Sequence, residues 1–206
     1  PVDRVIREGQ IVGIAEDTLL VTRDGQTRAI DDSAAPIRDG RGALVGTILV
    51  FRDVTGVRRE ERLRRFVAEA TSELSSSLDY EHTLATVARL AVPGVADWCA
   101  VDVLEDGRIK RLGVAHADPA RLELVREIER RYPSDPNADR GVPKVLRTGR
   151  SEFLPVIPPS AIEASARDAE HLTLIRKLDL RSYIAVPLKV RGQTFGVMSL
   201  ANSESR

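Results

Sequence analysis

Over residues 1–55 the hydrophobic pattern predicts short strands separated by tight turns. Residues 18–30 hold two runs of β-forming side chains on either side of Asp24-Gly25, a dipeptide typical of hairpin turns. A second turn at residues 39–42 precedes residues 44–51, which are almost all apolar. Such a run is typical of a central strand that is covered on both faces. We therefore expect about three antiparallel strands in this segment.

From residue 56 the pattern changes to that of a helix, which we expect over residues 56–78. Apolar side chains recur at steps of four, three and four residues, which is heptad spacing, at Leu63, Val67, Ala70 and Leu74. The hydroxyl of Thr55 can cap the start of this helix. The apolar stripe is narrow, so the helix is expected either to pair weakly with a copy of itself or to pack on its own domain.

Residues 79–206 alternate between helical and extended patterns. Asp79, Asp118 and Asp168 stand at predicted helix starts, and Ser160 with Glu163 has the spacing of a capping box. The pattern predicts helices over residues 79–92, 118–132, 142–147 and 168–178, and strands over residues 97–104, 109–116, 182–190 and 194–200. The fold class that follows is α+β, with an antiparallel sheet flanked by helices and preceded by a long helix and a smaller antiparallel sheet.

Composition restricts the binding partners and the cellular location that we expect for the protein. The 31 basic side chains equal the 31 acidic ones, so no overall field attracts nucleic acid. A single cysteine can form no internal disulfide, and no segment resembles a signal peptide or a membrane span. We expect a cytoplasmic location. Because the chain starts at Pro1 and stops soon after a strand-like run, we also expect a piece of a longer protein.

The motifs of common catalytic and metal sites do not occur in the sequence. It has no phosphate-binding Gly-rich loop, no His-Glu-x-x-His and no Cys-x-x-Cys, and its three histidines fall in three different elements. No metal and no cofactor is implied. Cys99 alternates with apolar neighbours, which favours a buried core thiol, whereas a redox or nucleophilic role is the alternative. We expect no catalytic centre in this chain.

Two stretches of the N-terminal third resemble a PAS domain. Residues 44–51, followed by Arg52-Asp53-Val54-Thr55, resemble its last strand and the motif that joins it to an output helix, and residues 30–37 resemble the strand and turn before it. The resemblance implies that residues 1–55 are the C-terminal part of a PAS domain. Asp53 and Thr55 would then fix the exit angle of the signalling helix by binding backbone amides and a neighbouring base.

The remainder of the chain resembles a GAF domain. The resemblance rests on residues 180–188 with 196–200, which look like its paired central strands, and on residues 96–102 and 141–149. It implies a GAF domain over residues 79–206 without the family's last helix. A ligand pocket would lie over the sheet face opposite the terminal helices, walled by residues 119–178.

Five polar-tipped residues are candidates for that pocket. Asp102 either contacts a ligand or pairs with a basic side chain at a strand end, because a buried carboxylate without a partner is costly. His116 presents an imidazole to the pocket or lies on the surface. The other three either line the pocket or are ordinary packing residues, and they are Tyr132, Ser182 and Tyr183.

These resemblances imply a sensory, regulatory and dimerisation module of a bacterial signal-transduction protein. The parent would be a sensor histidine kinase, or alternatively a metal-dependent serine phosphatase or a cyclic-dinucleotide enzyme. A homodimer is expected through the helix, with a possible small-molecule ligand in the GAF pocket. Two further alternatives remain open, namely a thiol-based enzyme that uses Cys99 and a GAF domain that serves only as a spacer.

Overall fold

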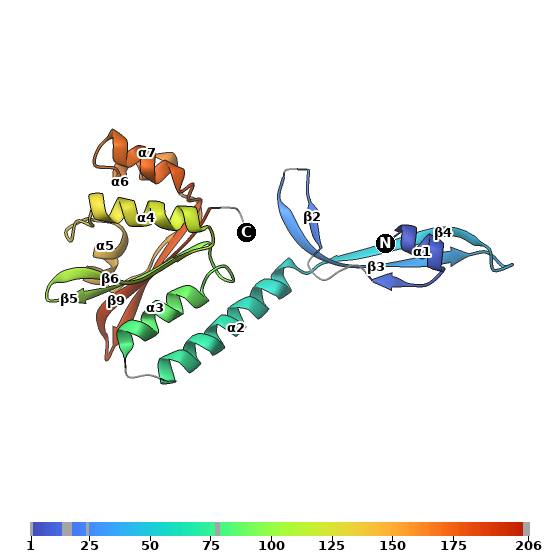
Figure 1. The fold of residues 1–206 in the computed structure, drawn as a ribbon, viewed down its shortest axis with the longest axis horizontal. Coiled ribbons are helices and arrows are strands. Elements are labelled where there is room, and N and C mark those ends of the chain that lie inside the picture. The colour runs from blue at the N-terminus through green and yellow to red at the C-terminus, as the bar shows by residue number, and fades with distance from the viewer. Residues whose placement is uncertain (1, 14–17, 24, 77–78, 204–206) are drawn as a thin grey trace. The chain divides into compact units, whose positions relative to one another are not determined.

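The computed structural model describes residues 2–13, 18–23, 25–76 and 79–203. The chain divides into two compact units, Pro1–Arg62 and Leu63–Arg206, and helix α2 (Thr55–Ser76) belongs in part to each of them. Both units contain antiparallel sheet together with helix (Figure 1). The expected α+β class is therefore confirmed. Residues 77 and 78, at the end of the predicted helix, lie outside the described residues.

The N-terminal unit is organised around one long pair of strands. Strand β3 (Thr27–Arg38) pairs with β4 (Leu44–Asp53), and two short strands also pair with β3, namely β1 (Val12–Gly13) and β2 (Leu19–Val21). The β2–β3 hairpin and the third strand β4 match the sequence prediction. Asp24 of the predicted turn lies outside the described residues, whereas Gly25 has a positive φ of 80°. Helix α1 (Val2–Glu8) and strand β1 were not predicted.

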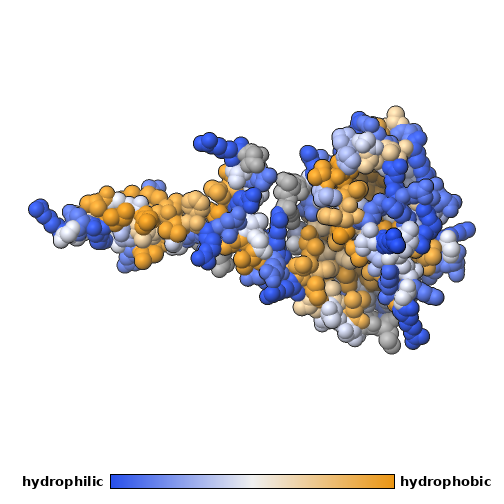
Figure 2. All heavy atoms as spheres, turned by 180° about the vertical axis from the view of Figure 1, so that it is seen from behind, coloured by the Kyte–Doolittle hydropathy of each residue, from blue (hydrophilic) through white to orange (hydrophobic). Residues whose placement is uncertain are grey.

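The prediction that residues 44–51 form a strand covered on both faces is wrong. Among the described residues β4 pairs with β3 alone, and its side chains Leu49, Val50 and Phe51 are 45%, 55% and 57% exposed. The buried side chains of this unit are few, because α1, β1 and β2 are too short to cover so long a ribbon; the small core consists of Val5, Val12 and Ala34. Apolar side chains consequently gather on the surface of the N-terminal unit (Figure 2).

Strand β3 also corrects the interpretation of residues 30–37 as a strand followed by a turn. The strand runs without interruption through Pro36 to Arg38, and the turn follows at residues 39–42. Asp39 organises that turn, since its carboxylate accepts hydrogen bonds from the amides of Arg41 and Ala43. The hairpin is therefore longer than the sequence pattern indicates.

The C-terminal unit is built on a five-stranded antiparallel sheet in the order β6-β5-β9-β8-β7. The strands are β5 (Trp98–Glu105), β6 (Arg108–His116), β7 (Glu152–Leu154), β8 (Ser182–Val190) and β9 (Gln193–Asn202). Helix α3 (Tyr80–Leu90) covers one face, and α4 (Pro119–Arg131) and α5 (Gly141–Thr148) cover the other (Figure 1). Two further helices pack outside α4, and they are α6 (Pro159–Ser165) and α7 (Ala169–Lys177).

Local capping chemistry accounts for most element boundaries in this unit. The carboxylates of Asp79, Asp118 and Asp168 each accept a hydrogen bond from a first-turn amide, at 3.1, 2.8 and 2.7 Å, which confirms the three predicted helix starts. Gly149 ends α5 in the left-handed conformation with φ of 60°. The predicted capping box is wrong: Ser160 lies inside α6, whose N-cap is Pro158, and Glu163 pairs with Arg176 instead. Strand β7 was also missed.

The two faces of the sheet bury different cores. Toward α3, alternate residues of β5 join a cluster with Leu84 and Ala88 of α3, and Phe66 of α2 packs against it; the β5 members are Cys99, Val101 and Val103. Toward α5, Val142 and Val145 pack on Ala185 of β8 and Val197 of β9. The period of two along each strand is what assigns successive residues to opposite cores.

A bulge in β6 decides which of its side chains face α4. Asp102 pairs with Arg111, but Val101 pairs with Gly113, so Leu112 is an extra residue on β6. Leu112 packs in the core on the α3 side, and Gly113 also lies against α3. From Val114 onward the alternation is therefore reversed relative to a regular hairpin. His116 thus shares a face with Trp98, its direct cross-strand partner.

Gly113 should be intolerant of any side chain, because a Cβ at this position would lie 2.6 Å from the backbone Cα of Ala85 in α3. We expect Gly113→Ala to lower the free energy of unfolding of the C-terminal unit by about 1 to 3 kcal/mol through overpacking. Urea denaturation of the whole chain measures this change. Gly94→Ala is the matched control, since nothing lies within 4 Å of the Cβ added there. Equal stability of the two variants would contradict the prediction.

Candidate functional site

The polar side chains of interest lie on the face of the large sheet that α4 and α5 cover. Trp98 and Asp102 face this side because they alternate with Cys99, Val101 and Val103, which face α3. Arg111 and His116 of β6 join them as their cross-strand partners. Neutral and charged polar groups are thereby enclosed between a sheet and two helices, an arrangement typical of small-molecule sites.

An ion cluster around the buried Asp102 links β5, β6 and α4. Arg111 Nε donates to Asp102 Oδ1 at 2.8 Å, and Nη2 donates to Oδ2 at 3.1 Å, so the pair is bidentate. Nη1 of the same guanidinium makes an ion pair with Glu129 of α4. The Asp102 side chain is only 3% exposed. Of the two roles that the sequence left open for it, the structure contains the pair with a basic side chain. Asp102 lies within β5, however, and not at the strand end that was expected.

Trp98 and His116 form the end of this face nearest the start of β5. The Arg111 guanidinium carbon lies 5.9 Å from the Trp98 ring centre, within the range of a cation–π contact. His116 is half-buried, and its Nδ1 accepts a hydrogen bond from the Asp118 amide at 2.9 Å. Burial, with a smaller effect of the nearby Arg121 guanidinium, lowers the pKa of His116. The imidazole is therefore neutral at physiological pH.

Tyr183 and Ser199 form a second polar pair on the same side. The Tyr183 hydroxyl lies 3.2 Å from Ser199 Oγ, and Ser199 is fully buried. Burial raises the pKa of Tyr183 to about 12, so the phenol stays protonated and can donate. This pair therefore offers hydroxyl groups to the interior without a charge.

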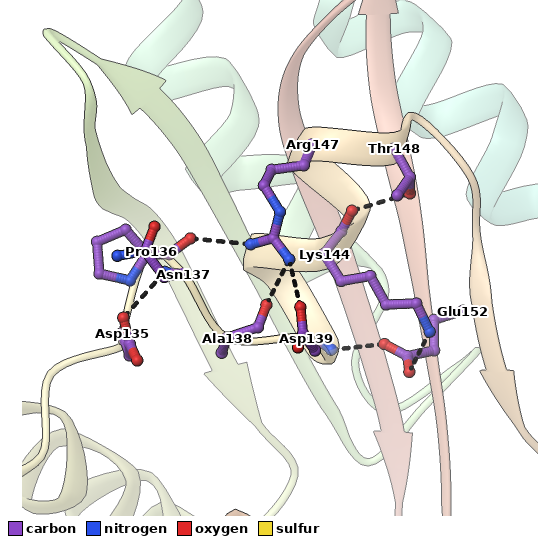
Figure 3. A network of polar contacts seen from close by, with 10 residues as sticks. Asp135, Pro136, Asn137, Ala138, Asp139, Lys144, Arg147, Thr148 and Glu152 are labelled. Carbon is purple, nitrogen blue, oxygen red and sulfur yellow. Dashed lines mark hydrogen bonds and ion pairs between the residues drawn. The ribbon is translucent and has the colours of Figure 1, made fainter.

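A polar network fastens the loop between α4 and α5 (Figure 3). Arg147 of α5 donates to the carbonyl oxygens of Pro136 and Ala138 and pairs with Asp139. On the other side of α5, Glu152 of β7 accepts from the Gly141 amide and pairs with Lys144 at 3.4 Å. These contacts tie both ends of α5 to their surroundings and hold it over β8 and β9.

The structure does not bring all five pocket candidates together. Asp102, His116 and Tyr183 lie on the α4 and α5 face. Ser182 precedes Tyr183 on β8 and therefore points to the opposite face. Tyr132 caps the end of α4, where its ring stacks on His171 of α7 at 4.0 Å and its hydroxyl donates to Asp168. The Tyr132 contacts are thus with α7 and not with the sheet.

Four residues of the site were not among the sequence-based candidates, namely Trp98, Arg111, Glu129 and Ser199. A signal for Arg111 existed, because the two-residue turn Asp106-Gly107, with φ of 51° and 75°, sets a register that pairs Asp102 with Arg111. Glu129 carried no such signal, since its place depends on how α4 packs.

A shallow concavity runs along α4 and shares no residue with the candidates; it is lined by Ala120, Glu123, Leu124, Arg126, Glu127 and Arg130.

Cys99 lies on the α3 side of the sheet and is fully buried among apolar side chains. Burial raises the pKa of its thiol to about 12, with a smaller effect of the Asp102 carboxylate. A thiolate is the reactive form of cysteine, so this thiol is both inaccessible and protonated at neutral pH.

The predicted junction residues lie where β4 leads into α2. Asp53 Oδ1 accepts from the Thr55 amide at 2.9 Å, and Asp53 also pairs with Arg28 at 3.3 Å. The Thr55 hydroxyl accepts from the Ala29 amide of β3 at 3.0 Å, so the prediction that this hydroxyl caps the helix is wrong. The hydrogen bonds from Thr55, followed by the Arg28 charge, lower the pKa of Asp53.

Within the described ranges, no group of three or more histidine, cysteine, aspartate or glutamate side chains is placed to hold a metal ion. In the same part of the chain, no helix is sufficiently long and apolar to span a bilayer.

Comparison with known proteins identifies the family. Residues 79–206 match the GAF domain family, so the chain belongs to it. The GAF domain of the A. aeolicus nlh2 protein in an inactive state has a TM-score of 0.51 at 16% identity, covering 72% of this chain and 84% of that one. This likeness supports the same fold. GAF domains are sensory and regulatory modules of signalling proteins.

Two bacterial phosphoenolpyruvate-protein phosphotransferases also contain similar GAF domains. The domain from Coxiella burnetii has a TM-score of 0.48 at 15% identity, covering 73% of this chain and 80% of that one. The domain from Acinetobacter has a TM-score of 0.43 at 17% identity, covering 72% and 78%. No match was found among the curated proteins.

Removing Arg111 should strongly destabilise the C-terminal unit. Arg111→Met leaves the buried carboxylate of Asp102 and the partly exposed carboxylate of Glu129 without their cation, and we expect a loss of about 3 to 5 kcal/mol in urea denaturation. Arg126→Met removes an exposed pair with Glu123 and should change stability by less than about 0.5 kcal/mol. A deficit for Arg111→Met no larger than that for Arg126→Met would contradict this assignment.

Cys99 should react with the thiol reagent DTNB only when the C-terminal unit opens. We expect the folded chain to be modified slowly and denaturant to make the reaction fast. An exposed cysteine introduced by Ser72→Cys on α2 serves as the control and should react at once in the folded chain. Rapid modification of Cys99 without denaturant would contradict the buried assignment.

Proposed function

We propose that this chain is the sensory and dimerisation part of a bacterial signal-transduction protein. In this proposal a small molecule binds between the sheet and α4 and α5, and its binding alters the arrangement of α2. The observation that carries the proposal is the heptad stripe of α2, in which Leu63, Val67 and Leu74 are exposed while Ala70 is buried.

One edge of the heptad stripe of α2 packs on the C-terminal unit, and the rest of the stripe is exposed. Phe66 packs against the core on the α3 side, and Ala70 is buried. Leu63, Val67 and Leu74 are 50%, 53% and 53% exposed. Leucine and valine at heptad spacing on an exposed helix face are what a parallel helix pair buries. A second copy of α2 is the partner that matches this stripe.

The position of α2 also supports a signalling role. It starts at the Asp53–Thr55 junction, where the Ala29 amide of β3 donates to the Thr55 hydroxyl and the Thr55 amide donates to the Asp53 carboxylate. These contacts suit the proposed identity of residues 1–55 as the C-terminal part of a PAS domain. Coupling requires an element with two arrangements that both sides can bias, and a weakly paired helix between two sensors meets that requirement.

The proposed parent protein is a sensor histidine kinase, with a metal-dependent serine phosphatase or a cyclic-dinucleotide enzyme as the alternatives. Catalysis is assigned to other parts of that parent. The burial and protonation of Cys99 support this assignment over a thiol-based activity in the GAF domain. The enclosed polar groups around Asp102 and Tyr183 support ligand binding over a purely structural spacer.

Disulfide crosslinking tests the helix pairing. Leu63→Cys and Leu74→Cys should each form a disulfide-linked dimer under mild oxidation in the full-length protein, because equivalent heptad positions meet across a parallel pair. The yield should depend little on dilution once a dimer forms. Ser72→Cys lies on the opposite side of α2 and should stay monomeric. If neither leucine position crosslinks at any protein concentration, or if position 72 crosslinks equally, α2 is not the dimer helix.

A further inference from the structure

Two buried N–H groups on adjacent strands of the large sheet lack a hydrogen-bond acceptor among the described residues. Trp98 Nε1 and His116 Nε2 are both buried, and neither has a partner among the residues that the structure describes. Trp98 and His116 are direct cross-strand partners of β5 and β6 and therefore share one face. An unsatisfied buried polar group costs about 1 to 3 kcal/mol, so two neighbouring ones call for an explanation.

The hydrogen bond at Nδ1 of His116 determines that Nε2 carries the proton of the neutral imidazole. Nδ1 accepts from the Asp118 amide at 2.9 Å, so the neutral ring carries its proton on Nε2. Nε2 is then a donor, as is the indole Nε1 of Trp98. Direct cross-strand partners have Cβ atoms roughly 4.5 to 5.5 Å apart, which lets one small molecule contact both rings. The missing partner of this pair is therefore an acceptor.

The charges around the pair restrict what that acceptor can be. The Arg121 guanidinium lowers the pKa of His116, and the carboxylates of Asp118 and Asp97 oppose this effect. Asp102 and Glu129 lie further along the same face, opposed by Arg111. Four carboxylates thus face two guanidinium groups, and Arg111 already engages both of its carboxylate partners through Nε, Nη1 and Nη2. A bound anion would meet net negative charge and no free cation among these groups.

We propose that Trp98 and His116 are the acceptor-binding end of the ligand site, and that they bind an uncharged small molecule through its carbonyl oxygen or ring nitrogen. This assignment rests on the proposed ligand-binding role of the GAF domain and adds the chemical class of the ligand. Uncharged acceptors satisfy both N–H groups without the repulsion that a carboxylate, nitrate or phosphate would meet.

Nuclear magnetic resonance of the ¹⁵N-labelled chain tests the proposal directly. Trp98 is the only tryptophan, so the indole N–H signal reports on this site alone. The probes are 2-pyrrolidinone and pyridazine as uncharged acceptors, with acetate and nitrate as anions of similar size. We expect the uncharged probes to shift the indole signal in a saturable way. The anions should bind at least about tenfold more weakly, equivalent to about 1.4 kcal/mol.

Variants show whether the two donors carry the binding. His116→Phe should weaken binding of 2-pyrrolidinone about tenfold, as expected for one lost hydrogen bond in a buried site. His82→Phe is the matched control, because His82 is exposed on α3, and it should have no effect. Where His116→Phe fails to fold, Trp98→Phe keeps the aromatic ring and removes the N–H, and calorimetry replaces the indole signal.

Three outcomes would overturn the proposal. They are tighter binding of acetate or nitrate than of the uncharged probes, binding unaffected by loss of either donor, and an indole signal that no probe moves, which would leave water as the acceptor. Probes that shift the amides of Tyr183 and Ser199 but not the indole would overturn this assignment alone, since ligand binding on the α4 and α5 face would stand. Failure of the α2 crosslinks would count against the proposed function and not against the ligand chemistry.

Discussion

The arrangement of the C-terminal unit depends on the burial of one carboxylate. Asp102 is 2% exposed in the middle of a central strand, where an unpaired charge would cost several kcal/mol. The bidentate ion pair with Arg111 offsets the free-energy cost of burying this carboxylate, and Glu129 extends the cluster to α4. One interaction thereby joins two strands of the sheet to the helix that covers them. The register of β5 against β6 and the position of α4 are both constrained by it.

Strand β5 also connects the candidate site to helix α2. Along β5, side chains alternate between the ion cluster on the α4 side and the apolar core on the α3 side, where Phe66 of α2 packs. A ligand that repositions Trp98 or Asp102 therefore acts on a strand whose other face contacts the helix core. Tightly packed interiors transmit small displacements because they have few voids to absorb them. This gives a physical route between the proposed ligand site and α2 through contacts that the structure contains.

The N-terminal unit has a different character, because its long β3–β4 ribbon exposes apolar side chains on a strand that looked central from its sequence. An apolar run indicates that a strand can be buried, but whether it is buried depends on the number of neighbouring elements. Here the neighbours are α1 and two strands of two and three residues, and their core is correspondingly small. The junction at Asp53 and Thr55 is better defined, since its hydrogen bonds join β3, β4 and α2 within a few residues.

Sequence alone determined the features that depend on neighbouring residues. The aspartate caps at residues 79, 118 and 168, the Asp106-Gly107 turn and the Gly149 stop follow from local hydrogen bonding and glycine geometry, so their positions could be predicted. The capping box at Ser160 failed because Glu163 has a distant partner, Arg176. Tertiary structure alone decided which side chains meet at the site. The extra residue Leu112 turns His116 toward Trp98, and Gly113 beside it lies against Ala85 of α3. Such a bulge depends on contacts between segments far apart in the chain, which no local pattern of residues 108–116 reveals.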